Sequence, residues 1–208
     1  EGRGRAAVAE IAANGGTATF VAHDLAGVNA AALATAATSA VGRPIDVLVN
    51  NAGIFGAPPT LHVDEATFDC YVDVNVKAPF FLTAALVPGM VELGAGSVVN
   101  IGSWVASRGV ATAALYSSTK AALEQLTRAW AAEFGPSGIR VNAVAPGVTL
   151  TEGTQAAEDR LRAMVEPIPA GRFGLVDEVA DAAVFLAGRR SSFIHGVVLA
   201  VDGGRLAI

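Results

Sequence analysis

Residues 97–130 read SVVNIGSWVASRGVATAALYSSTKAALEQLTRAW, and this stretch decides the fold. It opens with a short run rich in β-branched residues, which is typical of a buried strand. After a loop of small and polar residues, Leu123, Leu126 and Trp130 recur at three or four residue intervals, the spacing of an amphipathic helix. The stretch therefore predicts a strand over 97–101 and a long helix over about 113–134.

The same alternation of strand and helix continues in both directions. Strands are expected at TATFVAHDL (17–25), IDVLVN (45–50), 139–145 and 196–201, and helices from the start of the chain to the NGG at 14–16, then over 28–40, 64–93, 155–164 and 177–187. The run IDVLVN is of the kind buried on both faces of a parallel sheet. This order predicts a single α/β domain over 1–208, with a doubly wound, Rossmann-like parallel sheet covered on both sides.

Composition excludes several classes of protein. A net charge of −5 and a pI near 5.1 argue against a nucleic-acid surface. The three histidines show no metal-ligand spacing, so no metal is expected, and the single cysteine cannot form an intramolecular disulfide. The apolar stretch APFFLTAALVPGMV is interrupted by Pro88 and Gly89 before it can span a bilayer, and the first residues do not resemble a signal peptide. We expect no membrane segment and a cytoplasmic protein.

Small and polar residues follow each expected strand. In an open parallel sheet, ligands bind beyond the carboxyl ends of the strands, so these positions are the candidate binding edge. They are Asp24 and Leu25, NNAG at 50–53, GS at 102–103 and PGVTLT at 146–151.

Tyr116 and Lys120 lie four residues apart in the long helix, and therefore on one face. A cation within about 4 to 6 Å lowers the pKa of a tyrosine from its usual value of about 10, which makes the phenol usable as an acid or base. Ser103, at the end of the preceding strand, can offer a hydroxyl to the same crevice. A tyrosine and a lysine at helical spacing are usually surface residues. A catalytic assignment of the pair therefore depends on the other motifs in the sequence.

Four motifs fall in order at the expected ligand edge. They are VNNAG, NIGS, YSSTK and RVNAVAPG. Over about residues 1–204 the chain resembles the short-chain dehydrogenases/reductases, which have a doubly wound fold and bind NAD or NADP. The resemblance implies that Tyr116 is the general acid/base, that Lys120 lowers its pKa and holds the nicotinamide ribose, and that Ser103 fixes the substrate oxygen. It implies that Asn75, in DVNVKAPF, lies in a distorted helix that holds a water of the proton relay.

The resemblance also implies a cofactor site. Asp24 matches the acid that meets the adenine, with Leu25 beside it. The remaining residues belong to a turn near the adenine ribose and to a loop that grips the nicotinamide carboxamide: Asn51, Ala52 and Gly53, then Pro146, Gly147, Thr149 and Thr151. Purely structural alternatives exist: Asp24 caps a turn, Asn75 is a buried polar group of its helix, and VNNAG stiffens the centre of the sheet.

One part of the family pattern is missing from the printed sequence. A first strand, a glycine-rich turn TGxxxGxG, a helix and a second strand are expected before residue 1, and the glycines of that turn receive the cofactor pyrophosphate. In the family's strand order the two missing strands separate TATFVAH from IDVLVN. We therefore expect either a fragment that lacks the first βαβ unit or a sheet that closes differently, and the choice between NAD and NADP is unreadable.

The resulting hypothesis is an NAD(P)-dependent oxidoreductase that interconverts a carbonyl and a secondary alcohol of a small molecule. A non-catalytic binding or scaffold module of the same fold, and a lyase or epimerase that uses the same tyrosine, are the alternatives. The region 151–174 corresponds to the variable substrate lid, where Leu161, Met164 and Val165 suggest an apolar or amphipathic ligand. By resemblance we expect a dimer or tetramer that pairs through the helices at 64–93 and 113–134.

Overall fold

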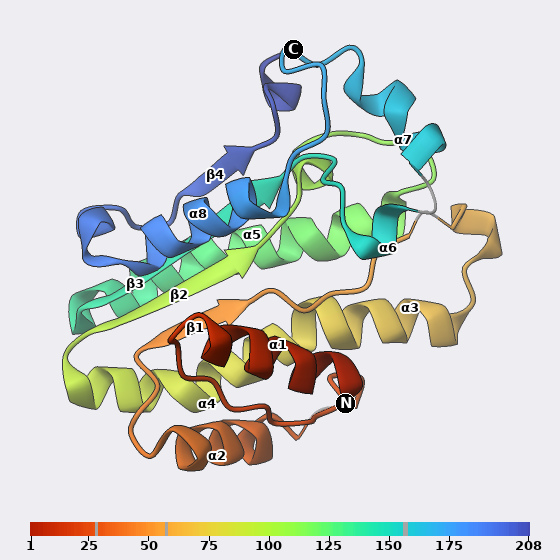
Figure 1. Cartoon of the computed structure of the whole chain (residues 1–208). Coiled ribbons are helices and arrows are strands. Elements are labelled where there is room, and N and C mark those ends of the chain that lie inside the picture. Colours follow the sequence, from red (N-terminus) through yellow and green to blue (C-terminus); the bar gives the residue numbers. More distant parts are fainter. Residues whose placement is uncertain (28, 57, 156–157) are drawn as a thin grey trace.

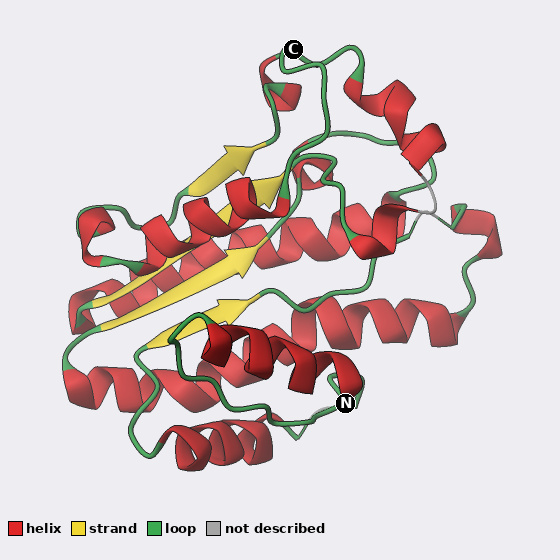
Figure 2. Cartoon of the chain, viewed as in Figure 1, coloured by secondary structure: helices red, strands yellow, loops and turns green. Residues whose placement is uncertain are grey.

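The computed structural model describes residues 1–208 except residues 28, 57 and 156–157 (Figure 1). Within the described residues, parallel strands form one sheet with helices on both faces (Figure 2). The strand order is β1 (Val47–Asn50), β2 (Gly96–Ile101), β3 (Ile139–Pro146) and β4 (Val198–Val201). The predicted α/β class with a parallel sheet is confirmed.

The helices follow the predicted alternation within a few residues. Their bounds are α1 Gly2–Ala13, α2 Ala30–Val41, α3 Glu65–Val72, α4 Ala78–Leu93, α5 Ala114–Phe134, α6 Glu152–Gln155, α7 Glu158–Val165 and α8 Val176–Ala187, and a π-helical turn, Asp73–Lys77, joins α3 to α4. The single helix predicted over 155–164 corresponds to α6 and α7. Residues 156–157 of that prediction, and residue 28 of the helix predicted over 28–40, lie outside the described residues.

Two separate cores cover the two faces of the sheet. Because successive strand side chains point to opposite faces, Val98 packs on the side of α2, α4 and α5, where Met90 and Trp130 are buried with it. Val99, its neighbour in β2, packs with Leu186 of α8 on the other side. The sheet is thus held between α4 and α5 on one face and α8 on the other, which fixes the carboxyl ends of β1, β2 and β3.

The strand predicted at TATFVAHDL is wrong, because residues 17–25 form no strand. Those residues have strand propensity, but a strand is stable only where a neighbour accepts its N–H groups and donates to its carbonyls. Nor does this segment pair with β1, which forms an edge of the described sheet. The prediction that IDVLVN is buried on both faces is also wrong, since Val47 and Val49 are 39% and 44% exposed.

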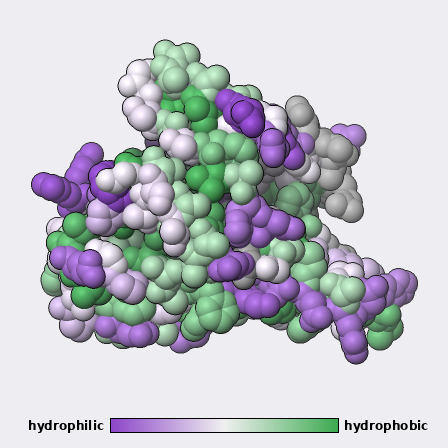
Figure 3. All heavy atoms as spheres, turned by 90° about the horizontal axis from the view of Figure 1, so that it is seen from below, coloured by the Kyte–Doolittle hydropathy of each residue, from purple (hydrophilic) through white to green (hydrophobic). Residues whose placement is uncertain are grey.

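Helix α4 continues through Pro88, in agreement with the helix predicted over 64–93. Pro88 lies on the exposed side of the helix, where water can reach the carbonyl that a proline cannot bond. By length and composition the stretch Glu65–Leu93 is apolar enough to cross a membrane, but 44% of its most apolar window is buried against the rest of the protein. Figure 3 views the molecule from the side of α2 and α4, and apolar and hydrophilic residues are interspersed there.

Candidate active site

A cavity of about 570 Å³ lies at the carboxyl ends of β1, β2 and β3, at the predicted binding edge. Its volume is within the range of small-molecule sites, which is about 300 to 1,000 Å³. The cavity brings together most of the predicted site residues: Asn51, Gly53, Ser103, Tyr116, Lys120, Pro146, Gly147, Thr149 and Thr151. Asp24, Leu25, Ala52 and Asn75 lie outside its described wall.

Lys120 is buried beneath the cavity, at 4% exposure. Its Nζ donates a hydrogen bond of 2.7 Å to the carbonyl oxygen of Ile101 at the end of β2, and lies 5.9 Å from the ring centroid of Tyr116. Gly53 permits this arrangement, because a Cβ at that position would lie 3.4 Å from Nζ. Burial lowers the pKa of Lys120 from 10.5 to about 8, and the charge of Glu124 acts in the opposite direction.

Tyr116 opens the first turn of α5, and its pKa is raised from its usual value of 10.0. Burial is the largest cause, because it removes the phenolate from water, and nearby Tyr71 raises the pKa further. A hydrogen bond with the Ser103 side chain lowers it by less. The expectation that Lys120 lowers the tyrosine pKa is therefore not met in this state, in which the ammonium is directed at Ile101. The phenol is protonated at neutral pH.

Ser103 follows β2 and forms the N-cap of a short 3₁₀ turn, Trp104–Ser107. Its Oγ accepts from the backbone N–H of Val105 at 3.5 Å, and the residue is 7% exposed. The end of a β-strand and the start of a helical turn thus fix the hydroxyl at the cavity wall beside Tyr116. An oxygen atom placed there would meet two hydroxyl groups from different elements.

Glu124 was missed by the sequence analysis. It lies four residues after Lys120 on the same face of α5 and is 3% exposed. Its Oε1 accepts a hydrogen bond of 3.3 Å from the backbone N–H of Ser103, and burial raises the pKa of its carboxyl. The available signal was the i, i+4, i+8 spacing, which puts a carboxylate on a helix face that otherwise points inward.

Asn75 lies in the π-helical turn and is 1% exposed, so the expected helix distortion at this position is confirmed. Its Oδ1 accepts from the N–H of Ile54 at 2.9 Å, while its Nδ2 donates to the Ile54 carbonyl at 2.9 Å and to Thr119 Oγ1 at 3.0 Å. Both amide hydrogens are therefore used within the protein. This bonding holds the loop after β1 in place, and the water relay stays a prediction.

The two asparagines of VNNAG have different surroundings. Asn50 is buried and donates to Asn100 Oδ1 at 2.8 Å, and Asn100 in turn donates to Thr127 Oγ1 of α5 at 2.8 Å. This chain of bonds ties β1, β2 and α5 together below the cavity, as the structural alternative for VNNAG proposed. Asn51 instead lines the cavity.

Asp24 is exposed, and its Oδ1 accepts from the backbone N–H of Ala26 at 2.9 Å, which is the turn-capping alternative. Leu25 follows it in the same bend. The structure does not bring either residue to the cavity, because the strand that was expected to carry them is not formed.

The lid region adds apolar side chains to the cavity. Leu161 and Met164 of α7 line it, whereas Val165 is 2% exposed and lies outside the described wall. Phe55, from the loop after β1, and Trp104 also line the cavity, and Trp104 is 4% exposed, so it belongs both to the core and to the cavity wall.

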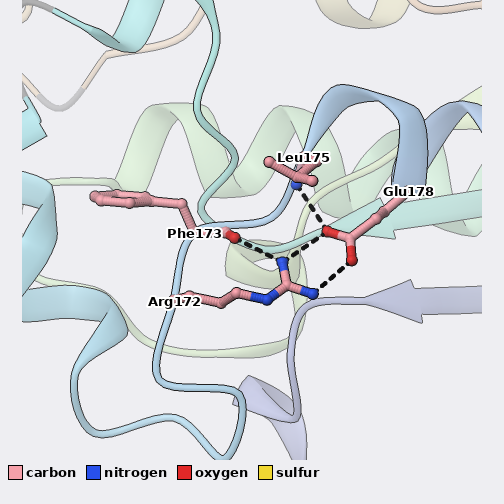
Figure 4. A network of polar contacts seen from close by, with 4 residues as sticks. All are labelled: Arg172, Phe173, Leu175 and Glu178. Atoms are coloured by element: carbon pink, nitrogen blue, oxygen red, sulfur yellow. Dashed lines mark hydrogen bonds and ion pairs between the residues drawn. The ribbon is translucent and has the colours of Figure 1, made fainter.

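A polar network fixes the far end of the lid to the start of α8 (Figure 4). Arg172 donates to both carboxylate oxygens of Glu178, at 2.9 and 2.6 Å, and to the Phe173 carbonyl at 2.9 Å. Glu178 also accepts from the backbone N–H of Leu175 at 2.8 Å. The hydrogen bond from Arg172 is the main reason why the pKa of Glu178 is lowered to about 2.

Solved structures with the same fold include enzymes with bound NADP. A putative NAD(P) dependent gluconate 5-dehydrogenase from Beutenbergia cavernae, with NADP at low occupancy, has a TM-score of 0.91 and 38% identity, and covers 97% of this chain and 82% of that one. A gluconate 5-dehydrogenase from Burkholderia cenocepacia, in complex with NADP and tartrate, has a TM-score of 0.91 and 32% identity over 98% of this chain and 81% of that one.

The sequence comparisons agree with the structural ones. The family model described as enoyl-(acyl carrier protein) reductase matches residues 1–205. The chain is 41% identical over 168 residues to L-xylulose reductase from Bos taurus, a match covering 79% of this chain and 69% of that protein. It is 39% identical over 168 residues to 2-dehydro-3-deoxy-D-gluconate 5-dehydrogenase from Bacillus subtilis, covering 79% and 66%. The chain therefore belongs to the short-chain dehydrogenases/reductases.

Proposed function

We propose that this chain is an NAD(P)-dependent oxidoreductase that interconverts a carbonyl and a secondary alcohol, with Tyr116 as the proton-transferring group. The observation that carries the proposal is that Ser103, Tyr116 and Lys120 line one cavity at the carboxyl edge of a parallel sheet. Relatives that share this fold are named as dehydrogenases and reductases, and two of the structures contain NADP, which supports NAD or NADP as the cofactor.

The residues of the cavity fit the nicotinamide end of such a cofactor. Gly53 leaves the floor open above Asn75 and Lys120, since a Cβ there would lie 3.1 Å from Asn75 Oδ1. Asn51 and Gly53 on one side, and Pro146, Gly147, Thr149 and Thr151 on the other, would hold the cofactor beside Lys120. When bound, the nicotinamide supplies or accepts the hydride.

Tyr116 donates the proton in the reducing direction. The phenol carries its proton at neutral pH and can transfer it from Oη to a carbonyl oxygen in the cavity. The Ser103 hydroxyl, fixed at the cavity wall, polarises and orients the same oxygen. In the oxidising direction the phenol must first lose its proton.

Lys120 stabilises the charge that remains on Tyr116 after the proton has left. With a pKa of about 8, the amine is mainly an ammonium at neutral pH. Nζ of Lys120 lies 5.9 Å from the ring centroid of Tyr116, so a small shift of the long lysine side chain would bring the ammonium to the phenolate. Above pH 8 this charge is lost, and the stabilisation with it.

The rival function is a non-catalytic module that has kept the fold. The experiment is a titration of the 208-residue chain with NADH and with NADPH, followed by nicotinamide fluorescence, and then a turnover assay in which nicotinamide absorbance is recorded with a panel of ketones. Saturable binding followed by oxidation of the nicotinamide is expected. Binding without oxidation of the nicotinamide by any ketone would favour the binding module. Product formation without a net change in absorbance would favour a lyase or epimerase.

We also infer that the chain pairs with a second copy through α4 and α5. Phe80 and Phe81 of α4 are 41% and 52% exposed, which supports an apolar contact there. Trp130 of α5 does not add to that surface, since it is 5% exposed and packs against Phe80 with ring centroids 5.9 Å apart. Sedimentation velocity tests the pairing, and a monomer at all concentrations would contradict it.

A further inference from the structure

Many of the side chains that line the cavity are apolar. They come from four separate segments, which are the loop after β1, the turn after β2, the loop before α5, and the lid helix α7. The principal ones are Phe55, Trp104, Val105, Val110, Leu161 and Met164. Apolar walls from four segments make a pocket in which a ligand loses water on most of its sides.

Trp104 is held rigidly in this wall. It is 4% exposed, and the guanidinium carbon of Arg205 lies 4.6 Å from its ring centroid. Arg205 Nη1 also donates to the backbone carbonyl of Met164 at 2.9 Å, so one residue fixes both the tryptophan and the lid. The indole is therefore a preformed flat surface and not a side chain that must be ordered when a ligand binds.

Phe55 forms another part of this apolar wall. It is 59% exposed, and a Cβ at Gly153 of α6 would lie 3.5 Å from its Cζ, so the ring extends toward the lid. An exposed aromatic ring at the edge of a cavity gains burial when a ligand covers it. Phe55 thus offers an aromatic surface to a ligand, while Trp104 contributes the small part of its ring that reaches the cavity.

Three threonine hydroxyls of the wall are engaged with the protein. Thr149 Oγ1 donates to the Gly147 carbonyl at 3.2 Å, Thr154 Oγ1 donates to the Thr149 carbonyl at 3.0 Å, and Thr151 and Thr154 share a contact of 3.1 Å. Of the cavity residues whose side chains the structure describes, Lys120 is the one with a charge, and it is bonded to Ile101. Ser103 and Tyr116 place two hydroxyls in this wall where a carbonyl oxygen can meet both, and Asn51 and Thr112 add two further polar side chains.

We propose that the substrate is a compact neutral ketone that carries an aromatic ring or a branched alkyl group beside the reacting carbon, and not a polyol or a sugar acid. A polyol would bury hydroxyl groups against Phe55, Trp104 and Leu161, where they lose hydrogen bonds to water. A carboxylate would lose its hydration, and the charged side chain of the described wall, Lys120, is already bonded to the Ile101 carbonyl. This inference rests on the proposed function, and it separates this chain from relatives named for gluconate.

The reaction balances as a two-electron reduction. A hydride from NADH or NADPH forms a bond to the carbonyl carbon while the C=O π bond breaks, and the electron pair of that bond takes the proton of Tyr116. The ketone is reduced to a secondary alcohol and the nicotinamide is oxidised. Tyr116 regains its proton from water.

The test compares substrates of different polarity with the full 208-residue chain. Acetophenone and 3-methyl-2-butanone represent the proposed class, and L-xylulose and 5-dehydro-D-gluconate represent polyols and sugar acids. We expect kcat/KM for acetophenone to exceed that for either sugar by about 100-fold, which corresponds to two or more buried hydroxyls without partners. Equal or better turnover of the sugars would overturn this inference and leave the proposed function standing. Turnover of none of them, with either nicotinamide, would overturn the proposed function itself.

A pair of matched variants tests the wall directly. Phe55→Ala should raise KM for acetophenone about tenfold, because the ligand loses an aromatic surface, and should change kcat by less. Phe193→Ala makes the same chemical change at a residue that is 100% exposed and lies outside the described wall, and it should change neither constant. Since neither phenylalanine is buried, both variants are expected to fold. An unchanged KM in Phe55→Ala would count against the inference.

Discussion

The carboxylate of Glu124 lies 3.3 Å from the backbone nitrogen of Ser103 and accepts its hydrogen bond. Glu124 is on the same face of α5 as Tyr116 and Lys120, at successive four-residue intervals, so one helix presents a phenol, an ammonium and a carboxylate to the end of β2. The carboxylate reaches back to the end of the strand and fixes Ser103, whose hydroxyl we propose meets the substrate oxygen. Glu124 is therefore a positioning residue in this account.

Replacement of Glu124 by Gln should change the pH dependence more than the stability. The amide keeps the shape and an oxygen acceptor for the Ser103 N–H, but it removes the negative charge that raises the pKa of Lys120. The lysine should then lose its proton at a lower pH, so the alkaline limb of the kcat/KM profile should move to lower pH. Glu124→Ala, which also removes the acceptor, should lower kcat about tenfold. Glu133→Gln, an exposed glutamate of the same helix, is the control. An alkaline limb at the same pH in Glu124→Gln and the control would contradict the role.

Gly102 should tolerate no side chain, because Glu124 fills the space beside it. A Cβ at position 102 would lie 2.6 Å from Glu124 Oε1, and the carboxylate is buried and cannot move away freely. Gly102→Ala should reduce the free energy of unfolding by about 1 to 3 kcal/mol and also lower kcat. At Gly89 of α4 the nearest atom to a Cβ is 3.8 Å away, so Gly89→Ala should raise stability by about 0.5 to 1 kcal/mol. Urea unfolding measures both, and equal effects of the two substitutions would contradict the packing.

The buried ammonium of Lys120 should make stability depend on pH. Its folded-state pKa of about 8 lies below the usual 10.5, so between these values the unfolded chain binds a proton that the folded chain lacks. The free energy of unfolding should therefore rise as the pH increases from 8 toward 10, by up to about 3 kcal/mol at about 1.4 kcal/mol per unit of pKa. Tyr116 has the opposite sign, because its pKa is raised above 10.0, so stability should fall at still higher pH.

Lys120→Met isolates this contribution. The variant keeps the length of the side chain but has no proton to lose, so its stability should lack the rise above pH 8. Denaturant unfolding of the two proteins at pH 7, 8, 9 and 10 measures the difference. Parallel curves for wild type and variant would show that the lysine is not held as the structure places it.

The sequence predicted the elements whose pattern depends on local spacing. The helix α5 was predicted from Leu123, Leu126 and Trp130, and two of these are buried in the fold as the spacing requires, Leu123 at 1% and Trp130 at 5% exposure. The segment 17–25 has an equally good local pattern but forms no strand, because strand formation depends on a partner that local sequence does not specify. Residue pattern therefore predicted the helices better than the edge of the sheet.

In the candidate site, too, local spacing predicted some features, while others depend on tertiary contacts. The spacing of Tyr116 and Lys120 along a helix predicted that they share a face, and both line the cavity. The direction of the tyrosine pKa depended on burial and on where the lysine points, which no spacing encodes. Glu124 escaped prediction because a glutamate in a helix is usually exposed, and only its contact with the Ser103 backbone distinguishes it.

The most direct test of the central claim is the rate of hydride transfer in a single turnover of Tyr116→Phe, compared with Tyr71→Phe. Tyr71 is 8% exposed and close enough to affect the pKa of Tyr116, so its replacement removes a neighbouring hydroxyl of the same kind. With acetophenone, or whichever ketone of the panel is turned over best, and excess NADPH or NADH, Tyr116→Phe should transfer hydride about 10²-fold or more slowly while binding the nicotinamide with unchanged affinity. Tyr71→Phe should remain within a few fold of wild type. Equal rates for Tyr116→Phe and wild type would contradict the assignment of Tyr116 as the proton donor.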